Sequence, residues 1–169
     1  MKRFIVNIII IVICFLFQTT IFPMISVKSI IPNIMVVFVA CAGFMQGSRY
    51  GLFVGFASGL LMDIYSFDIF GFYTILYMII GFTNGFIHNY FYLKDFKTPA
   101  LLITLTNIFT SLSIYVVLFL FRAKFEFLDY LINIIIPEIA FTLLISVIFY
   151  PLLWLVEANI FEKKKSESQ

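Results

Sequence analysis

Long runs of apolar residues, separated by short polar stretches, set the pattern of this chain. Four of these runs are long enough for one helix each, over residues 4–22, 71–90, 100–121 and 131–155. A helix needs about 20 apolar residues to cross roughly 30 Å of hydrocarbon. The pattern therefore predicts four helices that each cross a membrane once.

A further apolar segment, from Pro32 to Tyr65, is too long for one straight crossing and short for two. A polar cluster, Gln-Gly-Ser-Arg at residues 46–49, lies near its middle. A hairpin of two short helices, over 32–47 and 51–65, explains both the length of the segment and its polar interruption. The chain is then expected to cross the membrane six times.

The positions of the 11 lysines and arginines distinguish between five and six crossings. Cytoplasmic loops carry an excess of these residues. Six crossings with a cytoplasmic N-terminus place most of them inside, whereas five crossings would export the C-terminal lysines and reverse the excess. We therefore expect both termini in the cytoplasm, with one transmembrane domain over residues 1–161 and a short basic, polar tail over 162–169.

Composition supports a membrane protein and excludes several other classes. The chain is 63% hydrophobic and 12% charged, whereas a soluble domain has about 25% charged residues. The net charge of +2 is too small for a nucleic-acid-binding surface. The basic start and apolar stretch at the N-terminus resemble a signal peptide, but a small-residue cleavage site is missing, so we interpret this stretch as an uncleaved first helix.

Glycines at every fourth position form the most specific local pattern. Residues four apart lie on one face of a helix, and stripes without side chains let membrane helices approach closely. Such a stripe serves either packing within one subunit or docking of a partner's helix. The series consists of Gly43, Gly47, Gly51, Gly55 and Gly59, followed by Asp63, and it is repeated once by Gly81 and Gly85.

Two carboxylates and one polar stripe are expected inside the membrane, where a charged group costs roughly 2.5–3.5 kcal/mol at mid-bilayer. Asp63 lies at the outer end of its helix, where it either reaches the headgroups or has a function. Glu138 could accept hydrogen bonds from Asn or Thr side chains of a neighbouring helix. Asn107, Thr110 and Ser111 share one face of the helix over 100–121, and that face is expected to point away from lipid.

Catalytic and metal-binding patterns are absent from the sequence. The single histidine, His88, has no partners for a metal site or a triad and is assigned an interfacial or capping role. Cys14 and Cys41 lie in different apolar runs and are interpreted as packing residues. No phosphate-binding loop or zinc motif occurs, so we predict no cofactor, no metal and no enzyme activity.

Several of these features together resemble the family of the rod shape-determining protein MreD of bacteria. The similarity is strongest over residues 47–85 and becomes generic beyond residue 100. It depends on Gln18 and Pro23 at the end of the first helix, on Pro32-Asn33 opening the second, on the glycine series from Gly47 to Asp63, and on Gly71, Tyr73, Tyr77, Gly81 and Gly85 after it.

The resemblance implies a fold similar to the six-helix S-components of energy-coupling-factor transporters. It also implies a non-enzymatic scaffold of the bacterial cell-elongation machinery, in the cytoplasmic membrane, that supports peptidoglycan synthesis and maintains cell shape. The implied partners are the bitopic protein MreC, the actin-like MreB, and a RodA-type glycosyltransferase with its transpeptidase. Two alternatives remain open: a substrate-binding subunit of a vitamin-type transporter, and an intramembrane enzyme using Asp63 or Glu138.

Overall fold

The computed structural model describes residues 2–25, 31–66, 69–88, 97–122 and 130–157. All elements in these residues are helical, as the sequence predicts. Their order is α1 (Lys2–Leu16), η1 (Phe17–Ile21), α2 (Phe22–Ile25), α3 (Ile34–Gln46), α4 (Ser48–Ser66), α5 (Phe72–Ile87), α6 (Lys97–Arg122), η2 (Leu131–Ile135) and α8 (Ile136–Glu157), where η1 and η2 are π-helical turns.

Three of the helical runs are long and apolar enough to cross a membrane. They cover Phe4–Met24, Thr98–Val117 and Leu131–Glu157. Two further apolar helices, α3 and α5, are shorter, with 13 and 16 residues. The predicted lysine-rich tail over 162–169 lies outside the described residues, as does the end of the predicted helix over 71–90 beyond residue 88.

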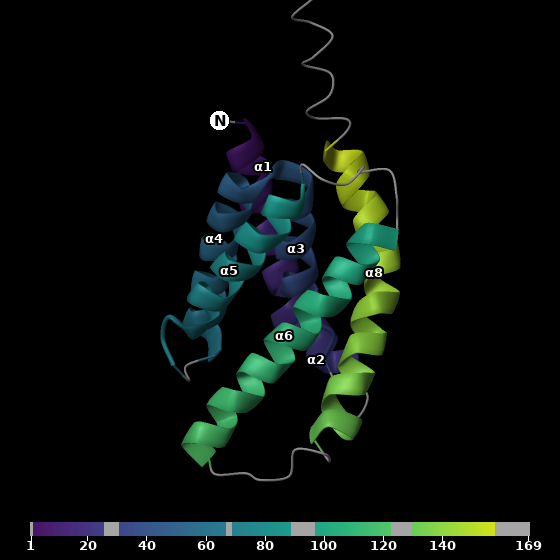
Figure 1. Cartoon of the computed structure of the whole chain (residues 1–169). Coiled ribbons are helices and arrows are strands. Elements are labelled where there is room, and N and C mark those ends of the chain that lie inside the picture. The colour runs from purple at the N-terminus through teal and green to yellow at the C-terminus, as the bar shows by residue number, and fades with distance from the viewer. Residues whose placement is uncertain (1, 26–30, 67–68, 89–96, 123–129, 158–169) are drawn as a thin grey trace, which may run out of the picture.

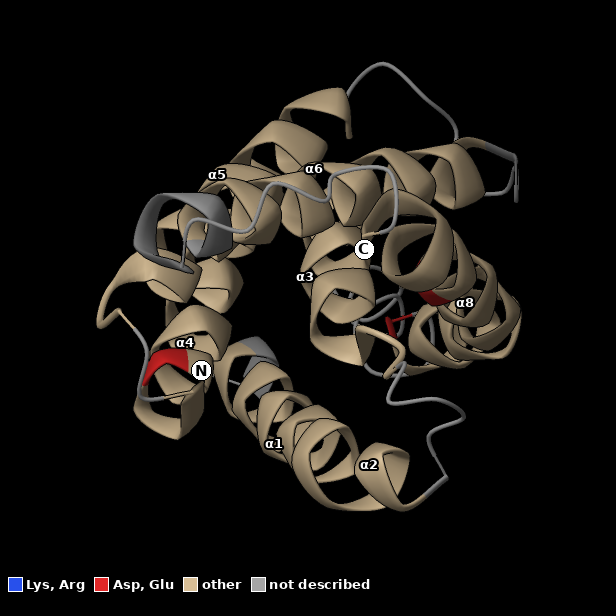
Figure 2. Ribbon diagram, turned by 90° about the horizontal axis from the view of Figure 1, so that it is seen from below, with Lys and Arg blue, Asp and Glu red and all other residues tan. Residues whose placement is uncertain are grey.

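Helix α3 forms the centre of the molecule, and the other helices surround it (Figures 1 and 2). Every residue from Ile34 to Met45 is buried, so α3 has no lipid-facing side. Helices α4 and α5 pack closely against each other and against α3, and α1 lies beside α4. Helices α6 and α8 pack together and contact α3 from another direction. A helix that is apolar on all sides is expected to be enclosed in this way.

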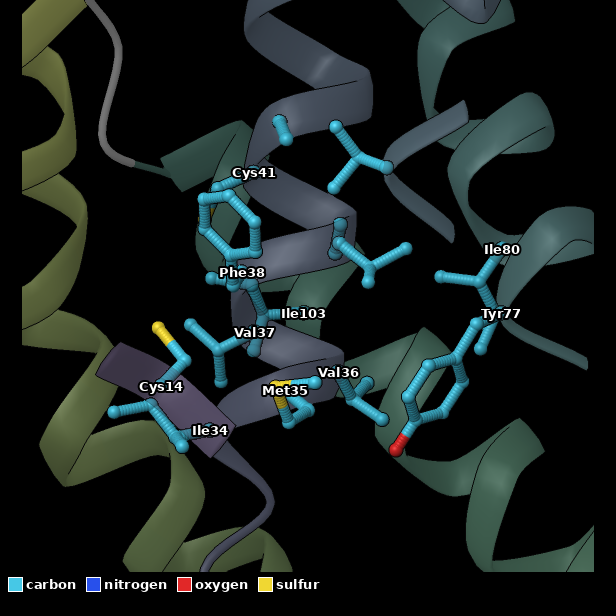
Figure 3. Packing of buried hydrophobic residues seen from close by; sticks show 14 of the residues in the cluster. Cys14, Ile34, Met35, Val36, Val37, Phe38, Cys41, Tyr77, Ile80 and Ile103 are labelled. Atoms are coloured by element: carbon cyan, nitrogen blue, oxygen red, sulfur yellow. The ribbon is translucent and has the colours of Figure 1, made fainter. Parts of the chain in front are cut away.

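The core around α3 consists mainly of aliphatic and aromatic side chains (Figure 3). Phe38 of α3, Tyr77 of α5 and Ile103 of α6 are among its largest fully buried side chains. Cys14 and Cys41 belong to the same core, as buried free thiols on α1 and α3. Both cysteines therefore lie among packed side chains, in agreement with the role predicted for them.

Two turns depart from the helices expected from the sequence. Gly47, expected on the second helix, instead caps the C-terminus of α3 with a φ of +89°, a conformation that glycine adopts without steric cost. Helix α4 consequently begins at Ser48 rather than at residue 51. Near the other end of the chain, Pro137 cannot donate to the carbonyl four residues earlier, and the turn before it, η2, is π-helical.

Candidate functional site

The glycine series lies inside the protein, at the contact of α3 and α4 with α5. A Cβ atom on Gly55 would overlap the carbonyl group of Tyr77. Gly51 and Gly81 face each other, so that a Cβ on either would overlap the backbone of the other. Because the obstructing atoms belong to backbone, no side-chain movement could make room for them.

The remaining glycines of the series complete this contact. Gly43 lies against the backbone of Gly81 and Gly85, Gly59 lies against Thr74, and Gly85 lies against Ser48 at the start of α4. Gly47 lies in the turn between α3 and α4, where a Cβ of its own would have room, but a Cβ on Gly85 would come within 2.6 Å of its backbone. The stripe thus joins three helices of one chain, and no room is left on these glycines for a partner's helix.

Asp63 holds the start of α5 and does not reach the headgroup region as an exposed side chain. Its carboxylate is 2% exposed and accepts hydrogen bonds from the N–H groups of Tyr73 and Thr74, at 2.8 and 3.0 Å. The Thr74 hydroxyl donates a third, short hydrogen bond. The first turn of a helix has unpaired N–H donors and a partial positive charge. The Asp63 carboxylate stabilises the start of α5 because it accepts hydrogen bonds from these donors and is attracted to this charge.

A first polar cluster closes the N-terminal end of α3. Asn33 caps the helix by accepting from the Val36 N–H, and its own N–H donates to the Thr142 hydroxyl of α8 at 3.2 Å. The Ile34 N–H donates to Gln18 of η1 at 2.8 Å. The Tyr77 hydroxyl of α5 donates to the Asn33 side chain at 3.4 Å. Four elements therefore converge on this helix end.

A second polar cluster closes the C-terminal end of α3. The amides of Asn7 on α1 and Gln46 on α3 exchange two hydrogen bonds, at 2.8 and 3.1 Å. The Gln46 amide also donates to the Glu157 carboxylate of α8 at 3.2 Å. His88 Nδ1 lies 2.6 Å from the Phe44 carbonyl oxygen, and since a carbonyl can only accept, Nδ1 carries the hydrogen. His88 thus has the capping role expected of it.

The length of α3 explains why both of its ends carry polar clusters. Its 13 residues span roughly 20 Å at 1.5 Å per residue, which is less than the roughly 30 Å of hydrocarbon in a bilayer. Helix-end N–H and C=O groups buried at that depth must find partners inside the protein. The two clusters provide these partners, and they join α1, α5 and α8 to the central helix.

A double-mutant cycle on Asn7 and Gln46 measures how strongly the second cluster joins α1 to α3. We expect Asn7→Leu and Gln46→Leu each to lower the thermal stability of the purified protein, with a coupling energy of about 0.6 kcal/mol, the average for such pairs in membranes, and no more than about 1.7 kcal/mol. Thr83→Val, on an exposed hydroxyl bonded only within its own helix, is the control and should not couple to Asn7. Strictly additive effects of the two leucine variants would show that the pair contributes nothing.

The polar face predicted on residues 100–121 points into the protein, toward α3 and α8. Asn107, Thr110 and Ser111 are all buried. The Ser111 hydroxyl donates to the Glu138 carboxylate at 3.1 Å, so Glu138 accepts its hydrogen bond from a serine of the neighbouring helix rather than from Asn or Thr. Thr110 bonds to the Thr106 carbonyl of its own helix, whereas the Asn107 amide has no hydrogen-bond partner.

Sequence patterns indicated only part of these clusters. The family resemblance alone pointed to Gln18 and to the Pro32-Asn33 pair. Both lie at the N-terminal end of α3. Asn7, Gln46 and Glu157 were not among the predicted site residues, although each is a polar residue at the edge of an apolar run. Such a position does not reveal its partner, because the residues that meet are far apart in the sequence.

Two grooves of similar volume lie between packed helices of the described residues. One, of about 340 Å³, separates α1 from α8 and is entirely apolar. The other, of about 300 Å³, separates α5 from α6 and contains the polar side chains Thr83, Asn84 and Thr106 among apolar ones. Across the described part of the chain, no group of three or more His, Cys, Asp or Glu side chains is placed to hold a metal ion.

Comparison with known protein families identifies this arrangement. The family model for the rod shape-determining protein MreD matches residues 1–159 of the 169-residue chain. The chain belongs to the MreD family. No curated protein and no solved structure matches it.

Membership in the MreD family confirms the resemblance found in the sequence and makes the protein a membrane component of rod-shape determination. The match continues well beyond residue 100, where the sequence motifs alone were generic. It therefore includes α6 and α8, and with them Ser111, Glu138 and the hydroxyl of Thr142 that binds the end of α3. MreD is a family of shape-determining structural proteins and not an enzyme family.

Proposed function

We propose that this MreD protein is a non-enzymatic scaffold of the cell-elongation machinery, which holds peptidoglycan-synthesis proteins together in the bacterial cytoplasmic membrane. The family match over residues 1–159 is the observation that carries the proposal. The expected partners are MreC, MreB and the RodA-type glycosyltransferase with its transpeptidase.

The packing of the helices supports a scaffold. The glycine series and both polar clusters are used within the chain, so they hold the helices in place rather than bind partners. The outer faces of the helices and the two grooves remain for contacts with other membrane proteins. A bundle held together by such internal contacts can present several outer faces to different partners.

The same proposal includes six crossings with both termini in the cytoplasm. Successive helices run in alternating directions, and the first residues of α1 lie at the same end of the molecule as the end of α8 (Figure 1). Arg49, in the first turn of α4, lies at that end too, as expected for a cytoplasmic basic residue. A fold similar to the S-components of transporters belongs to this proposal as well.

Depletion of this protein in its own rod-shaped host should produce rounded cells, and re-expression of the tagged protein should restore rods. The tagged protein, solubilised in mild detergent, should retain MreC and the RodA-type enzyme. An unrelated polytopic membrane protein with the same tag and expression level is the control. Rod shape after depletion, or equal recovery of the partners with the control, would argue against a scaffold.

The alternative of a substrate-binding transport subunit finds no support. The matching family is one of shape determination. In addition, the groove between α1 and α8 has no polar lining with which to orient a vitamin-like substrate.

A further inference from the structure

The contact between α6 and α8 differs in kind from the glycine contact between α4 and α5. Polar residues follow each other at every fourth position on α8, with Glu138, Thr142, Ser146 and Tyr150. On α6, Asn107 and Ser111 have the same spacing. Asn107, Ser111, Thr142 and Ser146 are each 1% exposed. We call the contact between these two rows of residues the polar seam.

The bond between Ser111 and Glu138 defines the register of this seam. Helices α6 and α8 run in opposite directions (Figure 1), so that one turn back along α6 lies level with one turn forward along α8. Asn107 lies one turn before Ser111, and Thr142 lies one turn after Glu138. Asn107 is therefore placed at the level of Thr142, with Ser146 one turn further along α8.

Three residues in the described part of the chain have buried side-chain polar atoms without a hydrogen-bond partner, and of these only Asn107 has two such atoms, its amide nitrogen and its amide oxygen; the other two are Ser58 and Ser66. An unpaired buried polar group costs roughly 1–3 kcal/mol. Membrane helices have no access to bulk water at this depth that could offset the cost. Retaining an asparagine here therefore requires a partner within the seam.

The neighbouring hydroxyls can share such a partner. Thr142 accepts from the Asn33 N–H, and its own O–H remains able to donate. Ser146 donates to the Leu143 carbonyl, and its oxygen lone pairs remain able to accept. A buried water makes about three hydrogen bonds, both as donor and as acceptor, to polar groups that are otherwise unpaired. One molecule can thus bond to the amide and to the hydroxyls on the facing helix.

We propose that the polar seam binds an ordered water molecule at Asn107, which bridges α6 to the hydroxyls of Thr142 and Ser146 on α8. This site is independent of the proposed scaffold function. Through Thr142 and Asn33 it also links α6 to the cluster at the N-terminal end of α3. Helix α6 is then joined to the centre of the protein by a water-mediated bridge, whereas α5 is joined to it by direct backbone contact.

Ser58 provides a matched comparison within the same protein. Its hydroxyl is also buried and without a partner. It lies on α4 between Gly55 and Gly59, and at both of these glycines the backbone of α5 is too close to leave room for a Cβ atom. A water site is therefore expected at Asn107 and not at Ser58.

Nuclear magnetic resonance of the full chain in lipid nanodiscs, with asparagine labelled by ¹⁵N, tests the site directly. Asn107→Ser identifies the side-chain amide signal of Asn107 by its loss. We expect a cross-peak between this amide and long-lived water, and none at the buried Asn84 amide, which donates to the Ile80 carbonyl. Absence of the Asn107 cross-peak would overturn the proposal.

Thermal unfolding adds a test in which the sign of the effect decides. If water completes the Asn107 bonds, Asn107→Leu breaks the bridge and should lower the Tm by at least roughly 2–4 °C. If the amide is simply unpaired, the same change removes an uncompensated group and should raise the Tm or leave it unchanged, which would count against the water. Ser58→Ala, the matched control, should not lower the Tm.

Discussion

Gly55→Leu is expected to abolish the folded protein. The leucine Cβ would overlap the Tyr77 carbonyl group, so the backbones of α4 and α5 would have to separate along their whole contact. Overpacking a core costs about 1–3 kcal/mol when side chains can adjust, and here no side chain is available to do so. We expect loss of the monodisperse peak in size-exclusion chromatography of the detergent-solubilised protein.

The neighbouring residue supplies the control for this prediction. Phe56 is 42% exposed on the outer side of α4, so Phe56→Leu should leave both the yield and the elution profile unchanged. Gly55→Ala should reduce the monodisperse peak less than Gly55→Leu does, because it adds only the Cβ atom. A Gly55→Leu protein that remains monodisperse and retains its Tm would show that α4 and α5 are not in backbone contact.

Asp63→Asn is expected to have the second largest effect. It should lower the thermal stability of the protein without abolishing its folded state. The carboxylate accepts from two backbone N–H groups and one hydroxyl, and an amide offers only one oxygen, while its NH₂ group would face a donor. Hydrogen bonds to charged groups contribute about 1.5–3 kcal/mol each. A loss of about 2–4 kcal/mol should lower the Tm by roughly 5–15 °C for a chain of this length.

Glu138→Gln is the matched control for this carboxylate. Glu138 is only partly buried and receives one hydrogen bond, from Ser111, which a glutamine oxygen can still accept. The Tm of the Glu138→Gln protein should change by no more than roughly 4 °C, because the expected loss of stability is less than about 1 kcal/mol. Equal losses for the two variants would mean that the Asp63 effect comes from removing any membrane carboxylate, and not from uncapping α5.

Much of the helical arrangement follows from the sequence alone. The apolar runs predict where helices form, and the polar residues 46–49 predict the turn between α3 and α4. The spacing of Gly51, Gly55 and Gly59 predicts a close helix contact because the period of the helix is fixed. The spacing does not predict which helix packs against these glycines, because the pattern is the same whether that helix belongs to this chain or to another.

The polar clusters were much less predictable, for a physical reason. Asp63 has the same sequence context whether it reaches the headgroups or caps α5, and only the position of Tyr73 and Thr74 decides between the two. The Asn7–Gln46 pair joins residues 39 positions apart. No local pattern specifies such a pair, because it exists only once α1 and α3 have packed together.

The burial of α3 on all sides has a consequence for how the protein is made. A ribosome delivers this segment to the membrane before α4, α5, α6 and α8 exist, although these helices form most of its surroundings in the finished protein. During synthesis α3 must therefore be shielded by the translocation machinery or be exposed to lipid for a time, without the partners that α5 and α8 supply to its polar ends. A nascent chain halted after α5 should accordingly be a ready target for membrane quality-control proteases.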